Sequence, residues 1–344
     1  MKLVSFRTAD DNERLGLYHN ENVYDLHDGA KALGLSLPPT MNGFLWQGDK
    51  AMDLARKVQE AAAADKIKAL DSKNLTMLPP VPHPASCRDA YAFRQHVATA
   101  RRNRGVAMIP EFDQFPIFYF TNHNAIIGAG DLLVEADHLH KLDFELEVAA
   151  VIGRKGRNVQ SKDADAYIAG YTIMNDFSAR VLQMEEMKLN LGPAKGKDFA
   201  TAIGPWLVTV DELADRRIKT EFGDKYDLRM TACHNDNHIS DGNMKDMNWT
   251  FAEIIERCAY GADIFPGDVI GSGTVGTGCY LELNGSWSLE AKERREEFTP
   301  VWLEDGDTIE LGIEGLGSLR NRIVRNKQDY SILAKKKLVE EPVS

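Results

Sequence analysis

The sequence predicts a mainly β protein of the α+β class, and three observations support that prediction. Short apolar runs alternate with glycine- and aspartate-rich turns through most of the chain after residue 84. Few stretches carry apolar residues at helical spacing. A hairpin is predicted over residues 15–18 and 22–26, because the residues between them favour turns. With 344 residues, the chain is long enough to bury a large core in one to three domains.

Two parts are predicted along the chain, residues 1–78 and residues 79–344. The first part continues after the hairpin with a helix over 51–68, where leucine, valine and alanine recur at helical spacing. Residues 79–84 are too rich in proline for a helix and are predicted to form an extended joint. The second part has predicted helices over 93–103 and 251–260, and the lysines at 335–337 are predicted to lie in a solvated tail.

The composition is typical of a soluble globular protein, with 43% hydrophobic and 27% charged residues. The net charge of −11 argues against a surface for nucleic acid or anionic membranes, so neither is expected as a partner. We find no signal-peptide pattern at the start and no apolar run of membrane length. These features predict a cytoplasmic protein.

The cysteines have no C-x-x-C spacing and are predicted to be free thiols in a reducing compartment; they are Cys87, Cys233, Cys258 and Cys279. One of them begins the stretch 233–238, which also holds two histidines and an aspartate and could imitate a zinc site. The stretch is rich in asparagine and aspartate, which build turns. We therefore predict a hairpin turn at this place.

Acidic side chains are the clearest signs of chemistry. Glu145 and Glu147 lie two residues apart in the β-prone run 141–149, so on a strand they would point to the same face. Two neighbouring carboxylates repel each other, and a divalent cation removes that conflict. The alternative is a solvated edge face. Asp176, which follows the apolar run 167–174, and Asp89 are two further candidate ligands. Oxygen ligands of this kind favour Mg²⁺, with Ca²⁺ or Mn²⁺ as alternatives, over Zn²⁺.

Two cations and one histidine accompany these carboxylates. Arg180 lies four residues after Asp176, and Lys197 follows a glycine-rich stretch. Both could offset the negative charge and hold substrate oxygens; the alternative is surface ion pairing, which contributes little. His96 lies seven residues after Asp89, and histidine is the usual general base near neutral pH. A structural or exposed histidine is the alternative.

Taken together and in this order, the segments resemble the fumarylacetoacetate hydrolase family over about residues 79–324. The resemblance rests on an Asp-x-Tyr element followed by a histidine, a D-x-E-x-E run, an N-D-F-S-A-R turn, and the later segments 192–199, 204–206 and 266–274. It implies a mixed β-roll of the kind found in these hydrolases, preceded by a small N-terminal domain like an SH3 barrel. It also implies a homodimer with the metal site near the interface.

The resemblance implies an enzyme that cleaves a carbon–carbon bond in a 1,3-diketo acid. The expected substrate is fumarylacetoacetate, cleaved to fumarate and acetoacetate in the catabolism of tyrosine and other aromatic amino acids. The family pattern gives roles to the following residues: Asp89, Glu145, Glu147 and Asp176 as metal ligands; His96 as the base and Glu282 as its orienting partner; Lys197, Arg180 and Gln183 for the developing negative charge; and Tyr91, Arg180, Gln183 and Thr274 for substrate binding.

Some alternatives stay open at this point. One arginine among Arg101, Arg102 and Arg104 is expected to reach the substrate, but spacing does not decide which. The substrate could instead be an acylpyruvate such as fumarylpyruvate. A second class is a decarboxylase or isomerase of a 2-oxo acid, which would use the enolate without water attack. A third is a non-catalytic scaffold, which would have no need to hold four mutually repelling carboxylates.

Overall fold

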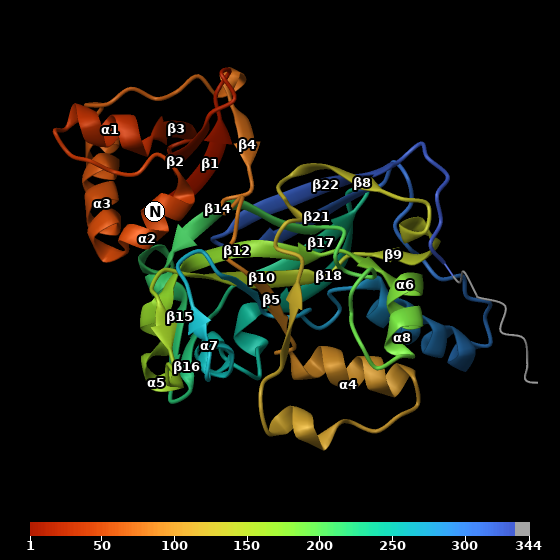
Figure 1. The fold of residues 1–344 in the computed structure, drawn as a ribbon. Coiled ribbons are helices and arrows are strands. Elements are labelled where there is room, and N and C mark those ends of the chain that lie inside the picture. Colours follow the sequence, from red (N-terminus) through yellow and green to blue (C-terminus); the bar gives the residue numbers. More distant parts are fainter. Residues whose placement is uncertain (334–344) are drawn as a thin grey trace, which may run out of the picture.

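A computed structural model describes residues 1–333, and a large mixed sheet runs through the middle of them (Figure 1). Most neighbouring strands are antiparallel; β20 with β5 and β14 with β7 are parallel. In spatial order the strands are β3 (Asn22–Asp25), β2 (Glu13–His19), β1 (Lys2–Arg7), β14 (Thr201–Thr209), β12 (Ile168–Asp176), β10 (Leu146–Ile152), β20 (Val269–Gly271), β5 (Cys87–Ala90) and β6 (Phe118–Thr121), with β4 (Thr76–Leu78) beside β1 and β7 (Ile126–Ile127) beside β14.

A second sheet packs across the strands β10, β12 and β14 of the large sheet. Its order is β18 (Asn237–Asn243), β17 (Arg229–His234), β21 (Thr308–Ile313), β22 (Gly317–Arg325) and β8 (Gly130–Val134). Shorter pairs complete the described strands: β9 (Leu142–Asp143) with β13 (Ser178–Ala179), β11 (Gly156–Arg157) with β19 (Asp263–Ile264), and β15 (Arg217–Thr220) with β16 (Gly223–Tyr226).

Strand β10 is buried on both faces, which explains its nearly continuous apolar sequence. Val148 and Ala150 belong to the core between the two sheets. Ala149 and Val151 belong to a second core, which the large sheet forms with the N-terminal helices. This division follows from the alternation of side chains along a strand. The strand that carries Glu147 is therefore held rigidly from both sides.

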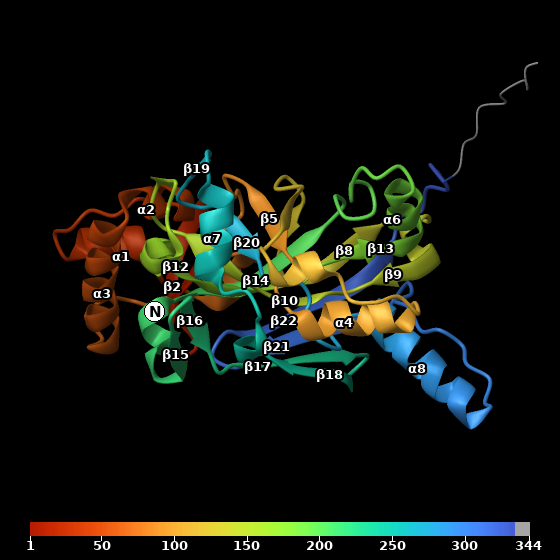
Figure 2. The same cartoon turned by 90° about the horizontal axis from the view of Figure 1, so that it is seen from below.

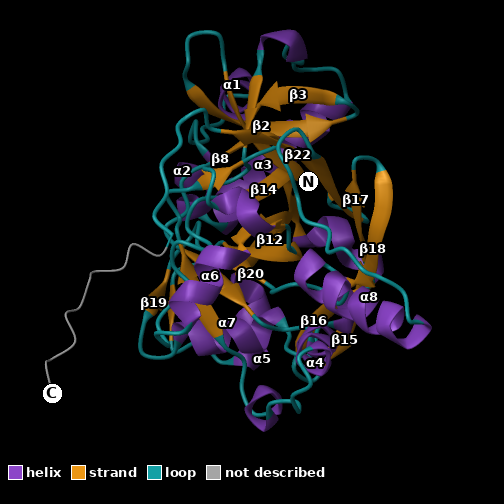
Figure 3. Ribbon diagram, turned by 90° about the vertical axis from the view of Figure 1, so that its right-hand side faces the viewer, coloured by secondary structure: helices purple, strands orange, loops and turns teal. Residues whose placement is uncertain are grey.

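The N-terminal region contains three helices that cover the large sheet near its β3 end (Figures 1 and 3). They are α1 (Leu26–Ala32), α2 (Met41–Gln47) and α3 (Asp49–Ala63). The helix predicted over 51–68 is α3, shifted toward the N-terminus. Strand β1 pairs with β14, so β1–β3 extend the large sheet. An SH3-like barrel is thus not confirmed, and the boundary at residue 78 remains a prediction.

The second part carries the remaining described helices: α4 (Arg94–Asn103), α5 (Ser161–Ala164), α6 (Arg180–Met187), α7 (Phe251–Ala259) and α8 (Tyr280–Arg294). The helices predicted over 93–103 and 251–260 are confirmed as α4 and α7, and Thr250 with Glu253 forms a capping box on α7. Helices α6 and α8 were not predicted. Helix α4 packs against α8 (Figure 2). Short 3₁₀ turns are η1 (Ser72–Asn74), η2 (Pro110–Asp113), η3 (His138–Lys141), η4 (Asp165–Tyr167), η5 (Val210–Arg216) and η6 (Met244–Asp246).

Several smaller predictions can be compared with the structure. The hairpin at 233–238 is confirmed, because β17 and β18 pair around Asn235 and Asp236, both with positive φ. All cysteines are free thiols. Among residues 1–333, no helix has the length and apolarity needed to cross a membrane. The predicted lysine tail at 335–337 lies outside the described residues.

Candidate metal centre and active site

Neighbouring strands bring the four predicted carboxylates together. Glu147 lies on β10, whose partners are β12, which ends at Asp176, and β20. Strand β20 in turn pairs with β5, which carries Asp89 opposite Gly271. Glu145 precedes β10, in the irregular residues that follow β9, so the two glutamates do not share one strand as predicted. Both glutamate side chains still reach the same cluster. The Glu145 N–H donates a 2.9 Å hydrogen bond to the side chain of Asn175, which precedes Asp176 on β12.

The four carboxylates form one buried cluster. One oxygen of each of Asp89, Glu145, Glu147 and Asp176 lies within 4.8 Å of the others. Gly271 makes this approach possible, because a Cβ there would lie 2.5 Å from Asp89 Oδ1 and 2.8 Å from Glu147 Oε2. Any larger residue would push these carboxylates apart. The alternative of a solvated edge face is therefore wrong.

One side of the cluster lacks protein partners. Among the described residues, no N–H or hydroxyl group donates a hydrogen bond to either oxygen of Glu147 or to Asp176 Oδ1. Burial, with the nearby Asp89 charge, raises the pKa of Glu147 well above its ordinary value. Burial and the Asp176 charge raise the pKa of Asp89 to about 7. Buried, unpartnered carboxylate oxygens are suited to a hard divalent cation, and this donor set fits one.

The other side of the cluster is paired with protein cations. Lys197 Nζ lies 2.6 Å from Glu145 Oε2 and 2.7 Å from Asp176 Oδ2. Arg180 Nη2 lies 2.8 Å from Glu145 Oε1. Burial alone would raise the pKa of Glu145, but Lys197 and Arg180 override it and lower the pKa to about 2. Both cations are buried, so the alternative of surface ion pairing is wrong.

Lys197 stays charged in this setting. Burial acts to lower its pKa, but the Asp176 and Glu145 carboxylates outweigh burial and raise it above the usual value. The ammonium is therefore a fixed positive charge at neutral pH. Such a group stabilises negative charge on a neighbouring oxygen more readily than it gives up a proton.

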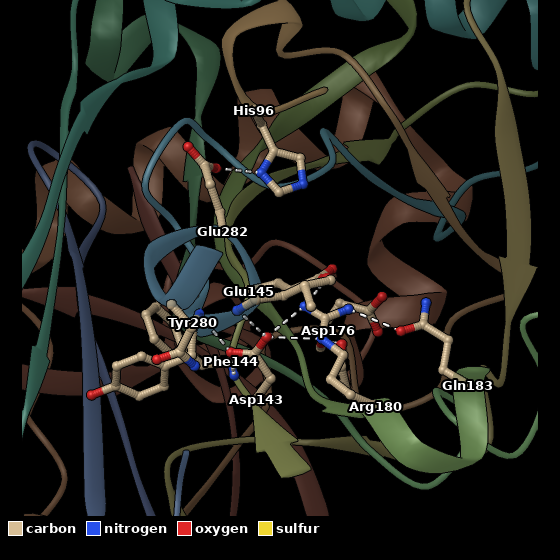
Figure 4. A network of polar contacts seen from close by, with 12 residues as sticks. His96, Asp143, Phe144, Glu145, Asp176, Arg180, Gln183, Tyr280 and Glu282 are labelled. Atoms are coloured by element: carbon tan, nitrogen blue, oxygen red, sulfur yellow. Dashed lines mark hydrogen bonds and ion pairs between the residues drawn. The ribbon is translucent and has the colours of Figure 1, made fainter. Parts of the chain in front are cut away.

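A histidine–glutamate pair lies beside the cluster. His96 is on α4 and Glu282 is the third residue of α8, and the His96 Nδ1 atom lies 2.5 Å from Glu282 Oε2 (Figure 4). Both side chains are buried. The Tyr91 ring contacts the His96 ring edge-on, with 6.0 Å between the ring centroids. A carboxylate that accepts the Nδ1 proton leaves Nε2 free to act as a base.

The other predicted residues surround this centre. Gln183 Oε1 accepts a 3.0 Å hydrogen bond from Arg180 (Figure 4). Thr274 is buried in the loop after β20, where the Gly273 N–H donates to Asp89 Oδ1 at 3.0 Å. Burial raises the pKa of Tyr91, while the positive charges of Arg104 and Arg101 oppose that rise.

The three candidate arginines at the end of α4 have different contacts. Arg104 Nε donates to the carbonyl of Ala100 at 3.1 Å, and Arg101 Nε donates to the carbonyl of Ala107. Arg102 instead points toward α8, where its Nη2 lies 3.3 Å from Ser286 Oγ.

Sequence reasoning missed two residues of the site. Tyr119 lies opposite Asp89 on the paired strand β6, and its hydroxyl donates to Asp176 Oδ2. Asp143 is fully buried and accepts a 2.8 Å hydrogen bond from Arg180 Nε. Asp143 is the first residue of the D-x-E-x-E run, which could have drawn attention to it. For Tyr119 the signal is a long-range strand pairing, which one sequence does not reveal.

The described residues form an α+β fold with a buried acidic cluster that can hold a divalent cation. The model of the fumarylacetoacetate (FAA) hydrolase C-terminal domain matches residues 86–324. This chain belongs to the fumarylacetoacetate hydrolase family, which includes hydrolases, isomerases and tautomerases.

Full-length relatives and solved structures agree with this assignment. The chain is 29% identical over 328 residues to the mitochondrial oxaloacetate tautomerase FAHD2A of Homo sapiens, covering 94% of this chain and 92% of the relative. A fumarylacetoacetate hydrolase from Exiguobacterium antarcticum has a TM-score of 0.66 at 22% identity, over 95% of this chain and 100% of the other. A maleylpyruvate hydrolase from Sphingobium sp. SYK-6, in complex with manganese(II) and pyruvate, has a TM-score of 0.65 at 20% identity, with the same coverage. The two solved structures support the fold alone.

Proposed function

We propose that this protein is a metal-dependent hydrolase that cleaves a carbon–carbon bond in a 1,3-diketo acid. The observation that carries the proposal is the His96–Glu282 pair at 2.5 Å, buried beside the four-carboxylate cluster. A base oriented by a carboxylate is the arrangement that activates water for attack on a carbonyl carbon. When bound, a divalent cation held by the carboxylates supplies Lewis-acid stabilisation of an oxygen anion.

The roles of the residues follow from their contacts. His96 Nε2 takes a proton from water, and Glu282 stabilises the imidazolium through Nδ1. The hydroxide oxygen bonds to the carbonyl carbon as the π electrons move onto the carbonyl oxygen. When these electrons return, the bond to the adjacent carbon breaks and its electron pair passes to that carbon and its neighbouring carbonyl. The resulting enolate takes up the proton that His96 removed from water. Lys197 and Arg180 lie where they can stabilise this negative charge.

Substrate carboxylates need local positive charge, because the chain as a whole carries a net charge of −11. We assign that charge to Arg101 and Arg104, whose positive charges act on Tyr91. Tyr91, Gln183 and Thr274 complete the polar groups we assign to substrate binding. Fumarylacetoacetate is the first substrate to test, and fumarylpyruvate the second. We further propose Mg²⁺ as the ion, a homodimer as the assembly and the cytoplasm as the location.

Oxaloacetate tautomerisation is the second candidate function. It is favoured by the relatives named oxaloacetate tautomerase, including the human protein over 94% of this chain. Tautomerisation removes the proton of the enol hydroxyl and adds a proton to the far carbon of the enol double bond, and no bond between carbons is broken. The same histidine could carry that proton. Decarboxylation and double-bond isomerisation of a 2-oxo acid involve the same kind of enolate.

One set of assays separates these functions. The Mg²⁺- or Mn²⁺-loaded protein is tested with fumarylacetoacetate, fumarylpyruvate and freshly dissolved enol-oxaloacetate, following product formation, enol absorbance and CO₂ release. The hydrolase proposal expects cleavage of a diketo acid as the fastest reaction and its loss in His96→Ala. The exposed His238→Ala variant serves as the matched control. Faster decay of enol-oxaloacetate, without cleavage of either diketo acid, would replace hydrolysis by tautomerisation.

A further inference from the structure

Asp143 is a fully buried carboxylate that is not part of the four-carboxylate cluster. Its two oxygens accept hydrogen bonds from Tyr280 N at 2.7 Å, Leu281 N at 3.0 Å and Arg180 Nε at 2.8 Å. We infer that Asp143 is a positioning residue. Its single carboxylate holds both the helix that carries Glu282 and the side chain of Arg180, which contacts Glu145. The inference deepens the proposed function, since it concerns how the His96–Glu282 pair is aligned with the metal centre.

Asp143 supplies a missing cap for α8. The first N–H groups of a helix have no partner within the helix and need an outside acceptor. Cys279, at the N-cap position, makes no side-chain capping hydrogen bond. Asp143, from β9, instead accepts from the first two N–H groups of the helix. A negative charge is also favourable at this end of the helix dipole. The place of Glu282, one residue further on, depends on this turn.

The same carboxylate is tied to the metal centre. Arg180 donates to Asp143 through Nε and to Glu145 through Nη2. Figure 4 shows the resulting path, which leads from Glu282 through the start of α8 and Asp143 to Arg180 and Glu145. The positive charge of Arg180 also explains how Asp143 can be buried without being a ligand. Asp143 therefore fixes two parts of the site relative to each other, although it touches neither His96 nor the cluster.

The first residue of α8 has a second, independent contact. His234 Nδ1 lies 2.5 Å from the Tyr280 hydroxyl, so the hairpin β17–β18 holds the side chain while Asp143 holds the backbone. This second contact provides a useful comparison. Tyr280→Phe removes the bond to His234 but leaves both N–H bonds to Asp143, and we expect it to disturb the His96–Glu282 pair less than a change at Asp143.

The direct test is Asp143→Asn, which keeps the shape but removes the charge and half of the acceptor capacity. The readout is the NMR resonance of the hydrogen-bonded His96 Nδ1 proton, assigned by its loss in His96→Asn and in Glu282→Gln. In Asp143→Asn we expect this resonance to broaden or disappear. We expect kcat to fall about 10²-fold, the size associated with an ångström-scale misplacement of a catalytic group. Metal content should be unchanged.

Thr250→Ala is the matched control, because it removes a helix cap on α7, away from the site. It should lower thermal stability as Asp143→Asn does, yet keep the His96 resonance and kcat. If Asp143→Asn also keeps the His96 resonance and kcat, Asp143 is only a structural cap and the inference is overturned. The resonance does not depend on which substrate is turned over, so failure of the proposed function leaves this result interpretable.

A second pair of variants decides the matter if Asp143→Asn does not fold. Leu281→Pro removes one N–H donor to Asp143 and leaves the Asp143–Arg180 contact in place. Proline is tolerated in the first turn of a helix. Leu281→Ala removes the side chain alone. The inference expects the His96 resonance to be disturbed in Leu281→Pro and retained in Leu281→Ala, and equal behaviour of the two variants would refute it.

Discussion

Two glutamates in the same short run, Glu145 and Glu147, are both buried and have opposite electrostatic surroundings. Glu145 contacts Lys197 and Arg180, and its pKa falls to about 2. Among residues 1–333, no N–H or hydroxyl group donates a hydrogen bond to Glu147, and the pKa of Glu147 rises well above the ordinary value. The protein thus balances the charge on one side of the cluster and leaves the other side for a bound cation.

The difference arises from the elements that face each residue. The segment from α6 to Lys197 places two cations against Glu145. Glu147 faces Asp89 and the backbone of Gly271, which contribute no positive charge. A fully paired cluster would have little affinity for a metal ion, and a fully unpaired one would oppose folding. The following predictions test this division, beginning with the largest expected effect.

Removing a carboxylate from the unpaired side should abolish metal binding. In Glu147→Gln we expect metal affinity to fall by more than the roughly 10–100-fold lost when an outer partner of a ligand is removed. Activity should be lost with the metal. Titration calorimetry with Mg²⁺ and Mn²⁺ measures the affinity, and an exposed change such as Glu290→Gln is the control. Wild-type affinity in Glu147→Gln would show that the unpaired side is not the metal site.

Removing a cation from the paired side should mainly affect rate. Lys197→Met keeps the length of the side chain without its charge, and we expect kcat to fall about 10²–10³-fold, as for other groups that stabilise a developing oxyanion. Metal content, measured on the purified variant, should be retained. Lys195→Met, two residues away and about half exposed, is the control. If Lys197→Met loses the ion or the fold instead, its role is to neutralise the cluster.

In the metal-free protein, replacing Glu145 and replacing Glu147 should have different effects on the free energy of unfolding. Glu145→Gln leaves Lys197 and Arg180 buried with less negative charge, which commonly costs about 3–5 kcal/mol for a broken buried pair. Glu147→Gln removes a carboxyl group whose ionisation is opposed by burial and by Asp89, and it should leave stability unchanged or raise it. Chemical denaturation of chelated protein measures both variants. Equal destabilisation by the two changes would contradict the division described above.

The smallest predicted effect is a pH dependence of stability without metal. Asp89 has an ordinary pKa of 3.8 and a folded pKa of about 7, so its stabilising contribution is lost as pH rises through that range. The pKa of Glu147 is also raised on folding, so its stabilising contribution is lost in the same way as pH rises. Glu145 is ionised in both the folded and the unfolded protein across this pH range and adds no pH dependence. Between about pH 5 and pH 8, the Tm of chelated protein should therefore fall, and added Mg²⁺ should raise it more at the higher pH.

Two observations check the origin of this effect. Glu147→Gln should flatten the dependence, because it removes one of the buried carboxyl groups whose pKa is raised. If the Tm of chelated wild-type protein does not fall across the window, Asp89 and Glu147 are already ionised throughout it. In that case the unpaired side would be balanced by groups other than a bound cation.

The sequence by itself indicated the candidate residues of this site. The residue types and order of Asp89, His96, Glu145, Glu147 and Asp176 resemble one family pattern, and that resemblance predicts an oxygen-ligand metal site with a histidine base. The sequence also predicted α4, α7 and the hairpin at 233–238, because their signals are local: helical spacing for the helices and turn-forming residues for the hairpin.

Tertiary structure decided how these residues are held. Asp143 meets the start of α8 from 137 residues away, and Tyr119 meets Asp176 from 57 residues away. The pairing of β1 with β14 likewise joins the N-terminal strands to the large sheet across some 200 residues of chain. Contacts of this kind depend on which strands and helices come to lie side by side, and no local pattern in the sequence records that choice.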